Sequence, residues 1–236
     1  MMRKEIFKYN GFSLVEMLLT IMILSVVMLL VATTLNTVIK ASNTANSKNL
    51  ARSDINYIME VYNRSLSNAE LEDIYLYSVS DNARIFTVES GLPKIKSLDS
   101  TAVSNAYENE LISLRDPTGY VGSEVHVKVY GYSVWTCLGF FKDVNGYGYI
   151  VKATNTTLTN HSECFNDNSV ITMLNSFSID VKDFNIQYVD IGDNRNSMFI
   201  VNSTVVPLFW PVGDSFPVTR DVSRQIVVST EALTWY

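Results

Sequence analysis

The sequence has few of the side chains on which catalytic and metal sites depend. It contains only two histidines and two cysteines in 236 residues. His126 and His161 are isolated in the sequence, and the cysteines form no C-x-x-C pair, so neither zinc nor a redox motif is indicated. No G-x-S-x-G, P-loop, H-E-x-x-H or complete G-x-G-x-x-G motif occurs. We therefore expect no enzymatic activity, cofactor or metal site, and we interpret both histidines as structural.

Two acidic segments, Asp143–Gly146 and Asp190–Asn194, resemble fragments of calcium-binding loops. Neither has the spacing or the terminal glutamate of an EF-hand loop. Asp, Asn and Gly at these positions are also typical of turns, which is our interpretation of both segments.

Glycine and proline are missing from a long N-terminal stretch, with neither between Phe12 and Ser90. Both residues interrupt helices, so their absence permits a very long one. Its later part has apolar residues at i, i+3, i+4, i+7 and i+11, the spacing of a helical face that packs on a sheet. These residues are Ile55, Ile58, Met59, Tyr62 and Leu66. The alternative is a separate amphipathic helix after a linker.

Residues 12–32 form an apolar run that contains one charge. As a helix this run is about 31 Å long, which matches the hydrocarbon core of a bilayer. It is too long for the apolar region of a removed signal peptide, and no A-x-A site follows it. Residues 1–11 carry three basic residues and one acid. This balance predicts a cytoplasmic N-terminus and a body outside the cytoplasm.

The single charge of the run belongs to Glu16, in the second turn of the predicted helix. An unpaired carboxylate in a membrane costs several kcal/mol, and an ordinary anchor has no need of one. Its presence indicates a cationic partner, reached within the membrane or within a packed assembly.

Lys8-Tyr-Asn-Gly11, followed by Phe12-Ser-Leu-Val-Glu16 and the apolar run, resembles the N-terminal signature of type IV prepilins and pseudopilins. In that family a dedicated membrane peptidase cuts after the glycine, the new first residue is usually N-methylated, and the glutamate serves assembly. The resemblance implies cleavage between Gly11 and Phe12, N-methylation of Phe12 and an assembly role for Glu16. It also implies three kinds of partner: prepilin peptidase, an inner-membrane assembly platform, and other pilin subunits packed along residues 12–66.

The rest of the chain is acidic. Residues 1–11 have a net charge of +2 and the whole chain one of −6, which leaves −8 for the remainder. Binding to a nucleic-acid backbone depends on releasing counterions with basic side chains, so we expect no direct nucleic-acid binding by the body.

Several segments of the body have strand-like patterns. Val125, Val127 and Val129 alternate with polar residues, and Asn145-Gly146 between two apolar runs is a strong hairpin signal. Further strands are predicted at residues 84–89, 177–188, 197–206 and 224–229, and a short helix at 103–114. Together with the long helix they predict an α+β fold: the helix packed on a mainly antiparallel sheet with loop insertions.

The order of the later segments resembles the large minor pilins and pseudopilins of the W/J type. An aromatic hairpin is followed by Ile179–Tyr188, a proline-containing loop and a closing strand at Val222–Val228. Within the proline-containing loop, Phe209, Trp210 and Phe216 are of the type enriched at interface hot spots. They predict a partner contact, the alternative being a loop folded back on the sheet.

Cys137 and Cys164 are expected to form a disulfide if the body is exported, the alternative being two buried thiols. The predicted organisation is a leader at 1–11, a transmembrane helix at 12–32, its amphipathic continuation at 33–66 and an extracytoplasmic head at 67–236. The predicted location is the bacterial inner membrane with a single span, and later a surface pilus or periplasmic pseudopilus.

Three functions fit these features. The first is a minor pilin that helps to initiate or cap a filament used in adhesion, motility or DNA uptake. The second is a pseudopilin of a type II secretion system. The third is a stand-alone anchored surface-binding protein, which would keep its leader.

Overall fold

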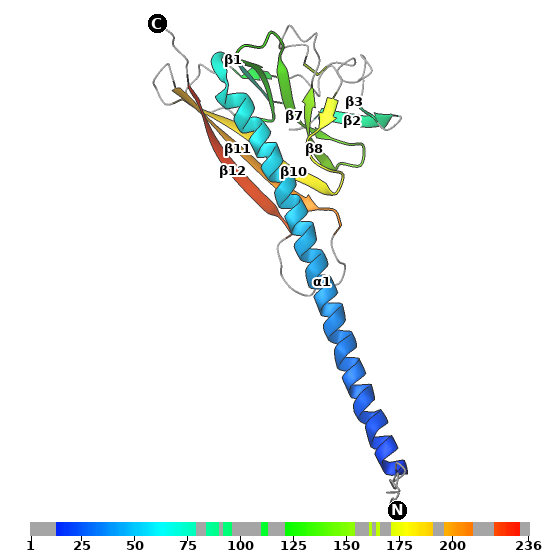
Figure 1. Ribbon diagram of the computed structural model, residues 1–236. Helices are drawn as coiled ribbons and strands as arrows, with labels where there is room; N and C mark the ends of the chain where they lie inside the picture. Colours follow the sequence, from blue (N-terminus) through cyan, green and yellow to red (C-terminus); the bar gives the residue numbers. More distant parts are fainter. Residues whose placement is uncertain are drawn as a thin grey trace, which may run out of the picture. The chain divides into compact units, whose positions relative to one another are not determined.

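The computed structural model describes residues 13–78, 84–89, 92–95, 110–112, 121–153, 161, 164–165, 171–190, 196–209 and 220–231. Within them the chain forms one helix and twelve strands (Figure 1). It divides into two compact units, Met1–Asn46 and Ser47–Tyr236. The predicted α+β class with a long N-terminal helix and mainly antiparallel sheets is confirmed.

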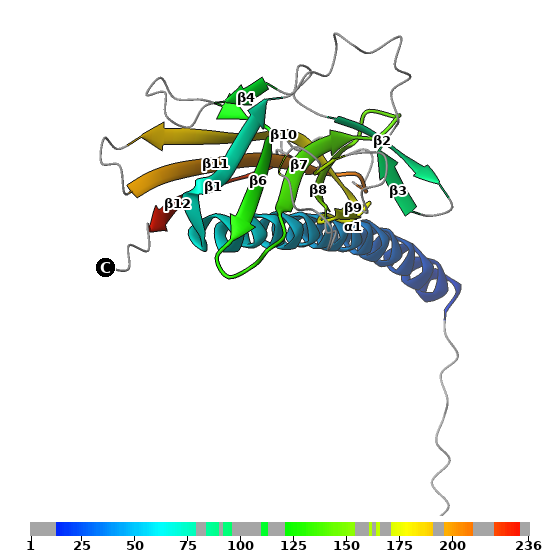
Figure 2. The ribbon, with the colours of Figure 1, turned by 90° about the horizontal axis from the view of Figure 1, so that it is seen from above.

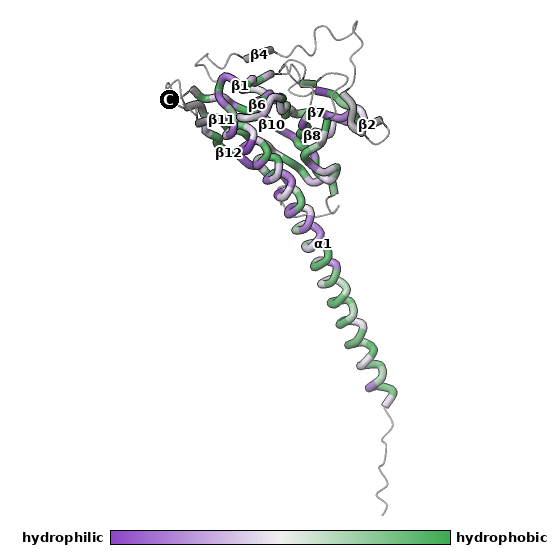
Figure 3. Tube along the Cα trace, turned by 45° about the horizontal axis from the view of Figure 1, so that its top comes forward, coloured by the Kyte–Doolittle hydropathy of each residue, from purple (hydrophilic) through white to green (hydrophobic). Residues whose placement is uncertain are grey.

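Helix α1 runs without interruption from Leu14 to Ser67. In the first unit its large apolar side chains, from Leu14 to Ile39, are between 48% and 78% exposed. Figure 3 shows hydrophobic colouring predominating along this part. The helix is long and apolar enough to cross a membrane by length and composition. The prediction of a single long helix is therefore confirmed.

The second unit contains two sheets. The larger has the strand order β3-β2-β7-β6-β1-β4, with β8 paired to β7 and β9 paired to β8. Among the described residues its strand pairings are antiparallel except that of β2 with β7. Its strands are β1 (Ala69–Ser78), β2 (Arg84–Glu89), β3 (Leu92–Ile95), β4 (Glu110–Ile112), β6 (Glu124–Val129), β7 (Thr136–Lys142), β8 (Gly148–Ala153) and β9 (Ile171–Met173).

The smaller sheet is antiparallel and has the order β12-β11-β10-β5. Its strands are β5 (Val121–Gly122), β10 (Ile179–Asp190), β11 (Asn196–Pro207) and β12 (Val222–Glu231). In Figure 2 its long strands run across those of the larger sheet. The predicted strand through Val125, Val127 and Val129 is present as β6, and the strands predicted at 84–89, 177–188, 197–206 and 224–229 and the hairpin are present too. Gly146 in the hairpin turn has a φ of 83°, which explains the need for glycine there.

The helix and both sheets share one core. The predicted stripe of α1 is buried, with Ile55, Ile58, Met59, Tyr62 and Leu66 at most 2% exposed. It packs with apolar residues from β1, β6, β7, β8, β10, β11 and β12. The amphipathic part of the helix therefore supplies one wall of the body.

The larger sheet is also buried on its second face. Cys137 and Phe141 of β7 point away from the first core into another cluster, which includes Tyr149, Cys164 and Phe165. Because side chains of a strand alternate between faces, β7 contributes Leu138 and Phe140 to the first core and these residues to the second. Covering both faces of β7 explains its nearly continuous apolar sequence.

One prediction was wrong and several strands were missed. Glu110–Ile112, part of the predicted helix at 103–114, is strand β4, because its backbone pairs with Leu76–Ser78 of β1. The remainder of that predicted helix lies outside the described residues. Strands β1, β3, β5 and β9 were not predicted. Pairing with distant segments decides such short strands more than local preference does.

Candidate functional site

The start of α1 is closed by a reciprocal pair of hydrogen bonds. The backbone N–H of Ser13 donates to Oε2 of Glu16 at 3.0 Å, and the N–H of Glu16 donates to Oγ of Ser13 at 3.2 Å. This is a capping box, in which two otherwise unpaired N–H groups are satisfied by side chains. It places the first helical residue at Leu14, three residues after Gly11.

The hydroxyl groups in the apolar part of α1 form hydrogen bonds within the helix itself. The hydroxyl groups donate to backbone carbonyls three or four residues earlier at 2.7–3.0 Å, in Thr20, Ser25, Thr33, Thr34 and Thr37. Such bonds leave no hydroxyl unpaired in an apolar environment. They make this part of the helix suitable for burial in lipid or in a bundle.

Glu16 differs because its charge has no countercharge among the residues that the structure describes. The capping box uses Oε2, and Oε1 can accept from a further donor. A carboxylate held in this way at a helix N-terminus is suited to bind an ammonium group of a second molecule. Gly11 and Phe12, the predicted cleavage pair, lie outside the described residues.

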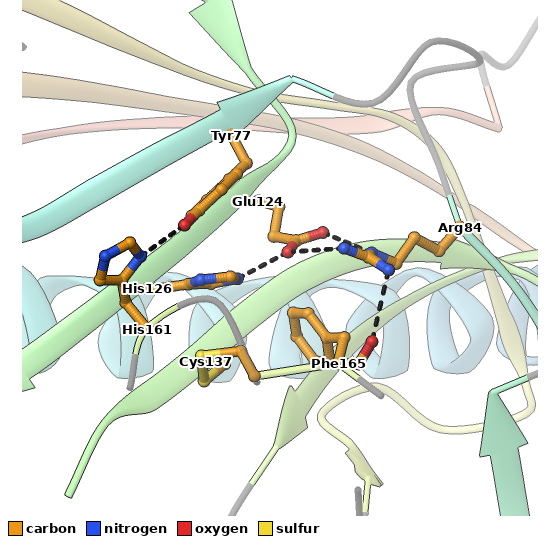
Figure 4. Close-up of a disulfide and its surroundings, with 8 residues drawn as sticks. Tyr77, Arg84, Glu124, His126, Cys137, His161 and Phe165 are labelled. Carbon is orange, nitrogen blue, oxygen red and sulfur yellow. Dashed lines mark hydrogen bonds and ion pairs between the residues drawn. A yellow bond between two sulfur atoms is a disulfide. The ribbon is translucent and has the colours of Figure 1, made fainter. Parts of the chain in front are cut away.

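In the body, β6 carries a buried charged cluster, which Figure 4 shows. Nε of Arg84 donates to Oε2 of Glu124 at 2.8 Å, and Nε2 of His126 donates to Oε1 of Glu124 at 2.6 Å. Glu124 is 1% and His126 2% exposed. Phe165 covers the cluster, with the guanidinium carbon of Arg84 5.5 Å from the centre of its ring.

His161, four residues before Phe165 in the sequence, extends this cluster. The hydroxyl group of Tyr77 forms a hydrogen bond with Nδ1 of His161 at 2.6 Å, and the His161 ring stacks on Tyr75 with centroids 3.8 Å apart. The ring of Tyr77 lies 4.2 Å from that of His126, between centroids. The two histidines thus belong to one region. Treating them as isolated was wrong, although their contacts agree with a structural role.

Burial and the charges within the cluster shift the pKa values of its side chains. Burial alone would raise the pKa of Glu124, but the Arg84 charge and the His126 contact outweigh it and lower that pKa. Burial, assisted by His126, lowers the pKa of His161. Burial and the Glu124 charge raise the pKa of Tyr77 to about 12. Because Glu124 and His126 are almost inaccessible, this arrangement can stabilise the body but offers no open site to a substrate.

Sequence reasoning missed the cluster because β6 resembles a half-buried strand. Val125 and Val127 face the first core, and the alternation alone does not show that the opposite face, with Glu124 and His126, is covered as well. The covering residues His161 and Phe165 come from a segment with no strand pattern. A glutamate and a histidine two residues apart on one face of a strand were the only available signal.

The structure brings the cysteines together. The Cα atoms of Cys137 on β7 and Cys164 are 5.7 Å apart, within the range for a disulfide, and the two are joined as a pair. Cys164 directly precedes Phe165, so the link holds the covering segment against the second face of the larger sheet.

Asp143 has its carboxylate engaged inside the hairpin turn. Its Oδ1 accepts from the N–H groups of Asn145 and Tyr147 at 2.8 and 2.9 Å. These bonds support the turn interpretation of Asp143–Gly146. Within the described parts of the chain, no three His, Cys, Asp or Glu residues are grouped to hold a metal ion.

Of the predicted contact residues, only Phe209 is described, and it is 74% exposed. Trp210 and Phe216 lie outside the described residues. Oγ of Ser47 donates to the backbone carbonyl of Phe209 at 2.8 Å. The aromatic ring is therefore free while its backbone is held.

We predict that the exported chain contains the Cys137–Cys164 disulfide. Closing a loop of this length stabilises the folded state by about 3–4 kcal/mol, so replacing both cysteines with serine should lower the free energy of unfolding by that amount. Non-reducing peptide mapping of the full-length protein should recover one linked pair of peptides. Two free thiols in protein from outside the cytoplasm would contradict the prediction.

We also predict that acid weakens the body in two steps. The folded chain disfavours protonation of His161, so stability is complete above its usual pKa of 6.5 and falls as pH drops below it. Glu124 is favoured as a carboxylate, so its contribution is lost below the usual 4.5. His161→Phe keeps a ring on Tyr75 and should flatten the change in melting temperature between pH 7.5 and 5.5, compared with wild type, in detergent-solubilised protein. An unchanged slope would contradict the role of His161.

Residues 6–32 match the family model described as a prokaryotic N-terminal methylation motif. The match includes Gly11, Phe12 and Glu16. No curated protein and no solved structure matches the chain significantly. The chain thus carries a prepilin-type N-terminal signal, of the kind found in type IV pilin-like proteins, on a membrane-capable helix that continues into an α+β body.

Proposed function

We propose that this chain is a minor subunit of a type IV pilus and helps to initiate or cap the filament in adhesion, motility or DNA uptake. The observation that carries the proposal is the methylation motif at residues 6–32, together with Glu16, which has no countercharge among the described residues and lies in the exposed apolar part of α1. The W/J-type resemblance of the body supports a minor role. We propose no enzymatic activity.

The proposed path begins in the bacterial inner membrane. Residues 1–11 lie in the cytoplasm, residues 12–32 span the bilayer, and the head lies outside. Prepilin peptidase removes residues 1–11 and Phe12 is N-methylated. An inner-membrane assembly platform then transfers the subunit from lipid to the filament, where other pilin subunits pack along residues 12–66.

Charge pairing gives assembly its driving force and its register. Cleavage creates an ammonium group on Phe12, and Oε1 of Glu16 accepts a hydrogen bond from the ammonium of a neighbouring subunit. In lipid each charge lacks a countercharge, whereas in the bundle both are paired, so insertion into the filament lowers the cost of both. The same pairing fixes how far one helix is displaced along the next.

The second candidate is a pseudopilin of a type II secretion system, because such proteins share the signal and the fold. Adjacent genes distinguish the two: retraction and adhesion genes favour a pilus, and genes for a secretion channel favour a pseudopilus. A stand-alone anchored binding protein is the third candidate, and it would retain residues 1–11.

Processing tests the proposed class directly. We predict a mature chain that begins at N-methylated Phe12, and we expect Gly11→Leu to block cleavage because the peptidase must accommodate the residue before the cut. Intact-mass measurement of membrane-extracted protein shows both results. A mass that still includes residues 1–11 in the wild type would exclude a pilin-like subunit and favour the anchored protein.

The assembly role of Glu16 can be separated from its capping role. Glu16→Gln keeps a side chain able to cap the helix but removes the charge, and Glu16→Val removes both. Leaving a buried ammonium unpaired costs about 3–5 kcal/mol. Both variants should therefore be cleaved normally yet enter sheared filaments at least about a hundredfold less than wild type.

The matched control is Ser13→Ala, which weakens the cap by about 1 kcal/mol and keeps the carboxylate. Quantitative immunoblots of membrane and filament fractions should rank Ser13→Ala well above Glu16→Gln. Equal incorporation of Glu16→Gln and wild type would mean that the charge is not needed. A loss as large in Ser13→Ala would assign the effect to capping.

A further inference from the structure

One nitrogen of the buried His126 ring has no hydrogen-bond partner among the residues that the structure describes. His126 is 2% exposed, its Nε2 donates to Oε1 of Glu124 at 2.6 Å, and its Nδ1 is left without a bond. A neutral imidazole that carries its proton on Nε2 has a lone pair on Nδ1. Buried polar atoms without a partner are uncommon in folded proteins, so this nitrogen requires an explanation.

The charge of Glu124 does not by itself explain a histidine at position 126. Two nitrogens of Arg84 already bind this carboxylate, at 2.8 and 3.3 Å. An amide side chain such as glutamine would supply the remaining N–H without leaving a ring nitrogen unbonded. What a histidine adds is a basic lone pair that takes up and releases a proton near neutral pH.

The neighbouring strand places a cysteine directly opposite this histidine. His126 of β6 is paired in register with Cys137 of β7. Directly opposite residues on antiparallel strands point to the same face, with Cβ atoms about 4.5–5.5 Å apart. Nδ1 is the ring nitrogen nearer to Cβ, so it is the nitrogen that can approach the sulfur across the two strands. Figure 4 shows His126 and Cys137 in the surroundings of the disulfide.

The other groups that contact the His126 ring do not compete for Nδ1. The ring of Tyr77 lies 4.2 Å away and that of Phe165 5.6 Å away, between centroids. The hydroxyl group of Tyr77 is bonded to His161 instead. The ionisable groups around His126 are Glu124 on its own strand, Tyr75 and Tyr77 on β1, Arg84 on β2, Cys137 on β7, and His161. Of these, the thiol of a reduced Cys137 is the donor that the register places opposite Nδ1.

We propose that His126 is the base that activates Cys137 when the Cys137–Cys164 disulfide closes. A carboxylate that orients an imidazole beside a thiol is the arrangement by which proteins make a thiolate at neutral pH. The base acts on the chain's own cysteine, so it needs no open site for a substrate. The chemistry requires only that the body leaves the cytoplasm reduced, and it does not depend on a role in a filament.

The reaction has two steps. First, the Cys164 thiol attacks a disulfide oxidant, of the thiol–disulfide oxidoreductase class, and forms a mixed disulfide while one oxidant thiol leaves. Then Nδ1 of His126 takes the proton of the Cys137 thiol, and the thiolate attacks the Cys164 sulfur. The Cys137–Cys164 bond forms, the bond to the oxidant breaks, and the second oxidant sulfur leaves and takes up a proton. The cysteines lose two electrons and two protons in total, which the oxidant gains as a pair of thiols.

The fold explains this order of attack. Cys137 lies in β7, which is paired with β6 on one side and β8 on the other. Cys164 belongs to none of the described strands, so an external disulfide reaches it more readily before the bond has formed. Cys137 therefore performs the second, intramolecular attack, for which a base fixed on the adjacent strand is in place.

The rate of closure in full-length, detergent-solubilised protein tests the proposal. Reduced protein receives one equivalent of dipyridyl disulfide, which reacts with thiols in mild acid. Acid quenching and mass measurement at successive times then separate the dithiol, the mixed disulfide and the closed pair. His126→Gln keeps an N–H for Glu124 but removes the base. An unassisted thiol has a pKa of about 8.5, and a more acidic thiol is a weaker nucleophile. Together these effects predict closure about tenfold slower in His126→Gln than in wild type at pH 6, with no such deficit at pH 9.

The matched control is His161→Gln, which removes the other histidine of the region and should close like wild type. Rapid closure of His126→Gln at pH 9 establishes that this variant still folds with its two thiols together. Equal rates of wild type and His126→Gln at pH 6, or the same loss in His161→Gln, would overturn the proposal. A deficit of His126→Gln that is equal at pH 6 and pH 9 would also overturn it, because a purely structural effect does not follow thiol protonation. Peptide mapping that places the mixed disulfide on Cys137 would refute the assigned order.

Discussion

A carboxylate in an apolar helix is stable only where another group offsets its charge. In the described part of α1 up to Ile39, the threonine and serine hydroxyl groups donate to backbone carbonyls of the same helix, and Glu16 alone carries a charge. The capping box gives one oxygen of Glu16 a hydrogen bond and pairs the first N–H groups of the helix, but it supplies no positive charge. The helix is thus complete in its hydrogen bonds and incomplete in its electrostatics. In the proposed filament this imbalance would favour a bundle of such helices, in which each carboxylate is paired, over a single helix in lipid.

In the body, the later part of the same helix has a different role: it forms part of the hydrophobic core. From Ala51 to Leu66 the stripe of α1 is buried against both sheets, so the body is built around the helix rather than linked to it. Burial of the second face of the larger sheet then removes the solvent from Glu124 and His126. A buried carboxylate is tolerable there because Arg84 binds it with two nitrogens, at 2.8 and 3.3 Å. The Cys137–Cys164 disulfide holds in place the segment that shields the Glu124–Arg84 ion pair from solvent.

Sequence patterns predicted those features that depend on local periodicity. The helix, the buried stripe and the hairpin follow from residue spacing and from the φ that Gly146 must adopt. Strands β1 and β4 were not predicted, because their pairing depends on segments far along the chain. The Glu124 cluster was not predicted for a related reason. The alternation in β6 indicates one buried face, and only the fold reveals that a distant segment covers the opposite face of the strand. The N-terminal signal was predictable because its elements are contiguous in the sequence.

Hydrogen bonds hold the body to helix α1 and to the residue that follows it at three positions. The carbonyl of Asn68, just after the helix, accepts from the N–H of Tyr130 at 2.8 Å, while Asp54 and Ser47 hold the segments that carry Phe177 and Phe209. Three connections spaced along residues 47–68 leave the body little freedom to rotate about its part of the helix. Gly148 adds to this rigidity, because a Cβ there would lie 2.0 Å from the carbonyl oxygen of Val181, so the two sheets approach each other at backbone distance. A surface fixed in this way loses little conformational entropy when it binds a partner, so even a small contact on it can contribute to the free energy of binding.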